Sequence, residues 1–203
     1  MSDSEEITQL IMRERQGRDR AWWEQMRQTF WPDATLRLSW IDGSATDFVE
    51  GSRKMAAGAS GAGHRLALPS IHIRDDRAVA EVSVTIQSRI LIGGVESDLA
   101  SYLRLLYRTE KRSQRWGIVR MDAIYEADTM TPALPGQTVI LDPKMLEGRR
   151  PSYRLLSYLL EQRGISVPND LYGVDQPGPL VELYRCAFEW ARIDHPDLLK
   201  VAG

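Results

Sequence analysis

One stretch of the chain indicates the fold: residues 78–125, which read AVAEVSVTIQSRILIGGVESDLASYLRLLYRTEKRSQRWGIVRMDAIY. The stretch is rich in β-branched and aromatic residues, and the turn signals Gly93-Gly94 and Arg112-Ser113-Gln114 divide it. This pattern predicts long strands over 78–92, 97–109 and 116–125, preceded by a shorter strand over 70–73. Adjacent strands of this length, joined by short turns, predict one antiparallel sheet that curves strongly.

The residues before this stretch predict helices and one further strand. Apolar spacing predicts a helix over 4–30 that is interrupted near Gly17, and a short helix over 46–57. Alternation predicts a strand over 35–40, with Asp42-Gly43 as its turn. Helices followed by a curved antiparallel sheet make an α+β domain. A curved sheet closed by N-terminal helices forms a conical barrel, which can hold a pocket.

The chain after the sheet predicts a helical extension. Two amphipathic helices are predicted, over 151–162 and 180–193. Helices of this size bury little surface by themselves, so we expect them to pack on the main domain or on a partner subunit. There they would cover the mouth of the pocket or build a subunit interface. The sequence therefore predicts a cone domain over residues 1–136 and a helical C-terminal extension over 137–203.

Composition and charge limit the function classes open to this chain. The residues are 43% hydrophobic and 27% charged, and the formal net charge is −2, with Lys and Arg scattered among acids. This balance gives no reason to expect nucleic acid as a partner. The single Cys186 excludes an internal disulfide and cannot build a zinc cage. No window reaches the roughly 20 apolar residues of a membrane span, and the acidic N-terminus has no apolar run, so we expect a cytoplasmic protein.

A run of small residues, 58–63, offers a possible phosphate-binding loop. It lacks the Gly-Lys-Ser/Thr ending of such loops, and no strand leads straight into it. We therefore interpret this run as a flexible connection.

Asp19 and His64 are the pair of residues that most suggests chemistry. Asp19 lies near the end of the first predicted helix, and His64 follows the run of small residues. A carboxylate that holds an imidazole makes a proton-abstracting base near neutral pH. Taken alone, the residues also allow Asp19 to cap a helix starting at Arg20 or to pair with a nearby arginine, and His64 to be an ordinary loop histidine. His72 is expected to face outward and His195 to be exposed, so the dispersed histidines predict no metal site.

Four segments in this order resemble the SnoaL-like, or polyketide-cyclase-like, branch of the nuclear transport factor 2-like superfamily. They are Asp19-Arg20-Ala21-Trp22-Trp23, Phe30-Trp31-Pro32-Asp33-Ala34, the segment 64–73 and Arg115-Trp116-Gly117-Ile118. The branch includes scytalone dehydratase and a hexachlorocyclohexane dehydrochlorinase, and the resemblance covers about residues 5–136. It implies a conical α+β barrel that associates as a homo-oligomer, a dimer or a trimer.

The resemblance also implies a site. Asp19 would orient His64, and His64 would remove a proton from the substrate. Two cationic positions of the family's pocket differ here, because Met121 and Glu14 stand where basic residues are expected. Strand alternation and the resemblance together predict a lining for the pocket. Its substrate-binding residues are Leu38, Trp40, Leu103, Leu105, Tyr107, Met121 and Tyr125, with Leu36 also facing inward.

Such a lining suits a small hydrophobic or aromatic substrate. The predicted function is a lyase that needs neither metal nor cofactor and eliminates water, a halide or an aldehyde. Tyr107 or Tyr125 would donate a hydrogen bond to a leaving or enolate oxygen. The alternatives are an isomerase, a non-catalytic ligand-binding or protein-interaction module, and the small subunit of a ring-hydroxylating oxygenase.

Overall fold

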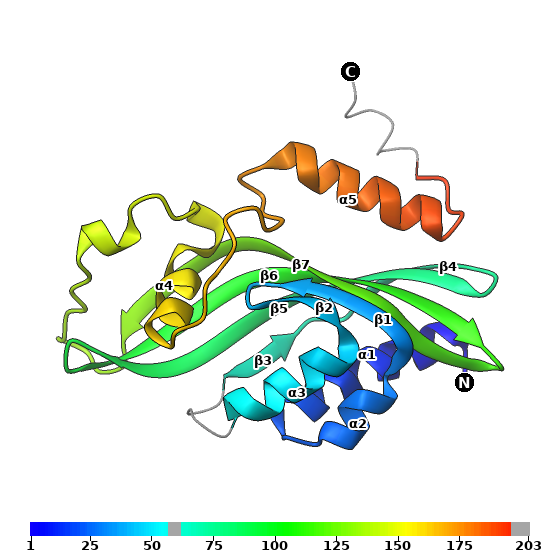
Figure 1. Ribbon diagram of the computed structural model, residues 1–203, viewed down its shortest axis with the longest axis horizontal. Coiled ribbons are helices and arrows are strands. Elements are labelled where there is room, and N and C mark those ends of the chain that lie inside the picture. The colour runs from blue at the N-terminus through cyan, green and yellow to red at the C-terminus, as the bar shows by residue number, and fades with distance from the viewer. Residues whose placement is uncertain (57–61, 196–203) are drawn as a thin grey trace.

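The computed structural model describes residues 1–56 and 62–195, which fold as helices on both sides of a long, curved sheet (Figure 1). The N-terminal part contains α1 (Asp3–Asp19), α2 (Trp23–Gln28), β1 (Phe30–Leu38), β2 (Ile41–Ser44) and α3 (Ala45–Ala56). The sheet continues with β3 (Gly63–Leu66), β4 (Ser70–Arg74), β5 (Arg77–Ile92), β6 (Val95–Arg112) and β7 (Arg115–Pro132). Two short 3-10 helices, η1 (Pro143–Leu146) and η2 (Pro151–Tyr153), precede α4 (Arg154–Gln162) and α5 (Pro177–Trp190).

The sheet confirms the predicted α+β fold class. Its strand order is β2-β1-β7-β6-β5-β3, and β4 also pairs with β5. The turns at Gly93-Gly94 and Ser113-Gln114 have positive φ at both residues, as a two-residue hairpin turn with matching twist requires. Both turns lie where the sequence predicted them, and β5, β6 and β7 run further than predicted, to 16, 18 and 18 residues.

One edge of the sheet differs from the prediction. The sequence predicts a turn at Asp42-Gly43, but those residues lie inside β2, and the chain turns at Ser39-Trp40. A long-range contact explains this turn, because the Ser39 N–H donates to the Tyr125 hydroxyl at 2.8 Å. In addition, β1 pairs with β7 in parallel, and the register shifts around Pro32, which has no N–H to offer the ladder.

The helical stretch predicted over 4–30 is divided into α1 and α2. The chain turns between them at Ala21, whose φ is +57°. Gly17 lets α2 approach α1 closely, since a Cβ there would lie 2.9 Å from the Cβ of Met26. The short helix predicted over 46–57 is present as α3.

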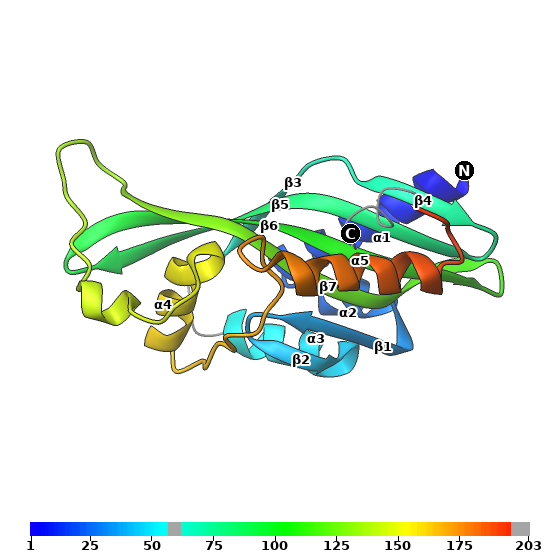
Figure 2. The ribbon, with the colours of Figure 1, turned by 90° about the horizontal axis from the view of Figure 1, so that it is seen from above.

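The two faces of the sheet carry separate hydrophobic clusters. Residues of α1, α2, α3 and α4, including Ile11, Phe48 and Leu156, pack with the inner face. On the opposite face, Val79 and Leu106 pack with α5, which lies along the sheet (Figure 2). Both C-terminal helices thus pack on the sheet. No helix within the described residues has the length and apolar character to cross a membrane.

Gly117→Ala is expected to destabilise the fold by about 1–3 kcal/mol, because it overpacks a fixed indole. A Cβ at Gly117 would lie 2.5 Å from Trp31 Nε1. Trp31 cannot easily move, because it donates to the Glu110 carbonyl at 2.9 Å and Arg115 stacks on its ring at 4.1 Å. Urea unfolding measures the loss. Gly178→Ala is the control, since its new methyl group meets nothing within 4 Å, and equal midpoints for both variants would contradict the argument.

Candidate active site

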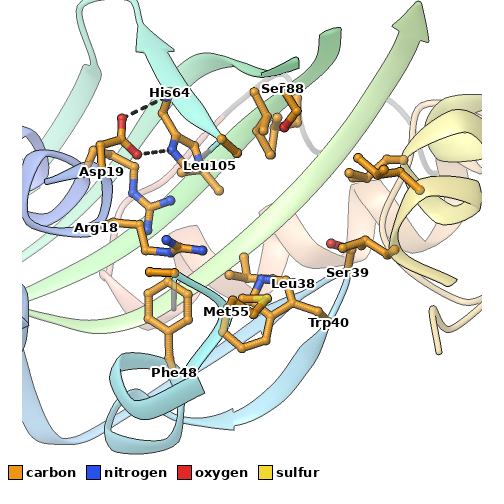
Figure 3. A pocket seen from close by; sticks show the side chains of 18 of the residues that line it. Arg18, Asp19, Leu38, Ser39, Trp40, Phe48, Met55, His64, Ser88 and Leu105 are labelled. Carbon is orange, nitrogen blue, oxygen red and sulfur yellow. Dashed lines mark hydrogen bonds and ion pairs between the residues drawn. The ribbon is translucent and has the colours of Figure 1, made fainter. Parts of the chain in front are cut away.

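The structure brings Asp19 and His64 into contact (Figure 3). Asp19 is the last residue of α1, and His64 lies in β3 beside it. One carboxylate oxygen, Oδ2, accepts the backbone N–H of His64 at 2.8 Å, and Oδ1 lies 2.5 Å from the ring Nδ1. The carboxylate therefore holds both the backbone and the ring of His64, which fixes the orientation of the imidazole.

The surroundings decide the protonation of the pair. Burial raises the pKa of Asp19, but the hydrogen bonds and charge of His64 outweigh this effect and lower it below its ordinary value. Burial lowers the pKa of His64, and the charges of Arg15 and Arg18 add to this, although Asp19 acts in the opposite direction. At neutral pH the imidazole is therefore uncharged. Its Nδ1–H donates to the Asp19 carboxylate, and Nε2 keeps its lone pair.

The structure also shows whether Asp19 caps a helix and where the other two histidines, His72 and His195, lie. The N-cap of α2 is Trp22, with no side-chain cap, so Asp19 does not cap that helix. His72 lies on β4 and its ring packs 5.1 Å from the ring of Phe188 on α5. His195 was expected to be exposed, but it is half-buried, and its ring packs 4.7 Å from the same phenyl ring.

A cavity of about 470 Å³ adjoins the pair. Its wall includes five of the seven residues predicted to bind substrate, namely Leu38, Trp40, Leu103, Leu105 and Tyr125. Phe48 and Met55 of α3 add further apolar surface. A substrate in this cavity would meet mainly aromatic and aliphatic groups, with the imidazole on one side (Figure 3).

Tyr107 and Met121 lie outside the described wall of this cavity. Tyr107 on β6 pairs with Met121 on β7, and the pair of Leu105 and Ala123 lies two residues further along the same two strands. The buried Glu14 and Arg15 of α1 cover this part of the sheet: the Tyr107 hydroxyl donates to Glu14 at 3.2 Å, and Met121 Sδ lies 4.0 Å from Arg15. The buried ion pair fills the cone above these two residues.

Tyr125, which is expected to donate a hydrogen bond to the substrate, lies in the wall of the cavity. Its hydroxyl oxygen accepts the N–H of Ser39, which leaves the phenolic proton available. Burial raises the pKa of Tyr125 to about 12, despite the opposing hydrogen bond from Ser39. The phenol is therefore neutral, and a donor, throughout the neutral pH range.

The wall includes two arginines that the sequence analysis did not assign to the site. Arg15 and Arg18 line the cavity beside Asp19. Arg15 lies three residues before Arg18 and four before Asp19, a spacing that places Arg15 on the same helix face as each of them and was a usable signal. The apolar residues of α4 also line it, namely Leu156, Leu159 and Leu160. The helix predicted over 151–162 is expected to cover the mouth of the pocket or to build a subunit interface, and these three leucines of α4 lie against the cavity.

The run of small residues and the predicted absence of a metal site are the remaining points of the sequence analysis. The small-residue run 58–63 lies largely outside the described residues, so its predicted role as a flexible connection stays a prediction. In the part of the chain that the structure describes, no three His, Cys, Asp or Glu side chains gather as metal ligands.

Comparison with known proteins gives consistent matches. The model of the family described as SnoaL-like domain matches residues 1–122. A PEP2-like protein of Fusarium vanettenii is 31% identical over 183 residues, which are 85% of this chain and 78% of that protein. The family match includes Asp19 and His64 but ends before α4.

Solved structures share the fold at low sequence identity. A hexachlorocyclohexane dehydrochlorinase of Novosphingobium barchaimii is 15% identical, with a TM-score of 0.52 over 68% of this chain and 93% of that one. A candidate scytalone dehydratase of Novosphingobium aromaticivorans is 14% identical, with a TM-score of 0.51 over 74% of this chain and 99% of that one.

Proposed function

Because the chain belongs to the family of SnoaL-like domains, as its sequence motifs predicted, we propose that it is a lyase acting on a small hydrophobic or aromatic substrate. His64 is the general base of the elimination, and Asp19 positions it. The observation that carries this proposal is the 2.5 Å contact between His64 Nδ1 and Asp19 Oδ1 at the wall of a cavity that aromatic and aliphatic side chains also line. The two neighbours with the same fold carry the names of elimination enzymes, which supports the reaction class.

In the proposed reaction, Nε2 of neutral His64 takes a proton from a carbon atom of the substrate when water or a halide is lost, and from a hydroxyl group when an aldehyde is lost. In the first case the electron pair of the C–H bond forms a C=C double bond, and the leaving group departs from the neighbouring carbon with its own electron pair. In the second case the electron pair of the O–H bond forms the C=O bond of the aldehyde, the C–C bond breaks, and the remaining carbon keeps the electron pair of that bond and takes the proton back from the imidazolium. Asp19 accepts the Nδ1–H and stabilises the imidazolium. Tyr125 donates to the leaving or enolate oxygen. When the leaving group is hydroxide, the imidazolium returns its proton, so that water is lost.

A substrate panel tests the reaction class. The protein is incubated with aromatic alcohols and diaryl compounds, and the products are identified by mass spectrometry and NMR. A product lighter by one water or one aldehyde supports the lyase, whereas a product of unchanged mass indicates an isomerase. Calorimetric binding without turnover of any compound would replace the proposal with a ligand-binding module.

The titration of His64 is a prediction that needs no substrate. We expect its NMR-monitored midpoint to lie below the ordinary 6.5, because burial and the charges of Arg15 and Arg18 disfavour the imidazolium. Arg18→Gln removes one of those charges, so the midpoint should rise. The exposed Arg13 of the same helix is the control, and Arg13→Gln should leave the midpoint unchanged. A wild-type midpoint at or above 6.5 would mean that His64 is charged too readily to act as this base.

A further inference from the structure

We propose that the cavity selects aromatic acids and that Arg18 binds their carboxylate. This inference rests on the proposed function, since it names the substrate class of the same site. Arg18 lines the cavity one residue before Asp19, in the last turn of α1. Its guanidinium is a specificity-determining group rather than part of the base.

The charges of the cavity wall support an anionic ligand. Among the described residues, four arginines line it, at positions 15, 18, 20 and 163, against a single acid, Asp19. Arg15 forms a buried salt bridge with Glu14, and the carboxylate of Asp19 is taken by His64. Within residues 1–56 and 62–195, no side chain or carbonyl forms a hydrogen bond or salt bridge with the Arg18 guanidinium. Arg20 and Arg163 are exposed, so Arg18 is the half-buried arginine of the described wall whose hydrogen-bond donors are unused.

The position of Arg18 makes an unused charge costly. The residue is half-buried, and burial together with the charge of Arg15 lowers the pKa of Arg18 to about 10. The side chain still carries its charge at neutral pH. A partly desolvated cation gains more from a bound anion than an exposed cation does. The planar guanidinium also matches a carboxylate with two parallel hydrogen bonds.

The arrangement of the wall indicates how an aromatic acid would lie. Arg18 is on the same side of the cavity as Asp19 and His64, and Trp40 and Phe48 border the same space (Figure 3). A ring against the two aromatic side chains, with its carboxylate on Arg18, would place the substrate beside the imidazole. Arg20 and Arg163 are exposed, so they stand at the rim, where their charge attracts anions toward the opening.

A structural role for Arg18 makes a different prediction. A basic residue in the last turn of a helix is stabilised by the helix dipole. If that were the whole role of Arg18, its removal would lower the stability of the protein without altering ligand preference. Ligand preference is therefore the decisive measurement.

The test compares 2-naphthoate with 2-naphthamide, and benzoate with benzamide, by isothermal titration calorimetry. Each pair keeps the ring and removes only the charge. We expect each acid to bind the wild-type protein about tenfold or more tightly than its amide, as suits a charged hydrogen bond. Arg18→Gln should lose this preference, Arg18→Lys should keep part of it, and Arg13→Gln should keep all of it.

Several results would overturn the inference: equal affinity of acid and amide, no binding of either acid, or a preference that survives in Arg18→Gln. The His64→Gln variant separates the inference from the proposed function. It should keep the preference for acids while losing elimination. Elimination unaffected by His64→Gln, with the acid preference intact, would refute the base and leave the role of Arg18 standing. If the wild-type protein showed no preference for acids while His64→Gln abolished elimination, the role of Arg18 would be refuted and the base would stand.

Discussion

His64→Gln is expected to lower the rate of elimination by about 100- to 10 000-fold, the usual contribution of a positioned general base. Glutamine can still donate a hydrogen bond to Asp19, but its amide group has no basic nitrogen that could replace Nε2 of His64. The measurement is kcat/KM on whichever compound of the panel is turned over. His72→Gln is the matched control, because His72 packs on α5 and is remote from the cavity wall. Equal turnover by His64→Gln and wild type would reject the base.

Asp19→Asn separates positioning from proton transfer. Asparagine keeps the size of the side chain but lets His64 adopt the other tautomer, with the proton on Nε2. We expect a large loss of kcat together with a changed 15N spectrum of the His64 ring. A loss of activity with the Nδ1–H tautomer retained would show that Asp19 acts in some other way.

Arg15→Met is expected to lower the free energy of unfolding by about 3–5 kcal/mol, because it leaves Glu14 buried without its counter-charge. The two side chains are 6% and 0% exposed, and Tyr107 also donates to Glu14. The double variant Glu14→Gln/Arg15→Met should recover most of the loss. It buries no charge, and the glutamine oxygen still accepts from Tyr107.

The control for this prediction is an ion pair of the same type on the surface. Arg27 and Glu24 are 60% and 62% exposed, so Arg27→Met should leave the midpoint of urea unfolding unchanged. A double variant no more stable than Arg15→Met would show that the uncompensated charge is not the cause of the loss.

Local signals in the sequence predicted the long hairpins, because β-branched runs and two-residue turns act over a few residues. They failed at Asp42-Gly43, where a hydrogen bond from Ser39 to Tyr125, distant in sequence, fixes the turn elsewhere. Alternation also predicted which face Tyr107 and Met121 occupy, but alternation carries no information on depth. A buried ion pair from α1 occupies the cone at their level.

The contact between Asp19 and His64 could not follow from spacing, since the two residues lie 45 positions apart. The family resemblance supplied that expectation. Arg18 was visible in the sequence, but only the structure shows that its guanidinium lines the cavity and forms no hydrogen bond with the described side chains.

The cavity takes Asp19 and His64 from the N-terminal part of the chain and one side of its wall from α4, which follows the segment matched by the family model. The apolar surface that α4 supplies is thus encoded apart from Asp19, His64 and Arg18. A changed α4 would alter the fit of the apolar part of a ligand and leave the proposed base and the proposed carboxylate site in place. For protein engineering, a chimera that swaps α4 is the natural route to a new selectivity.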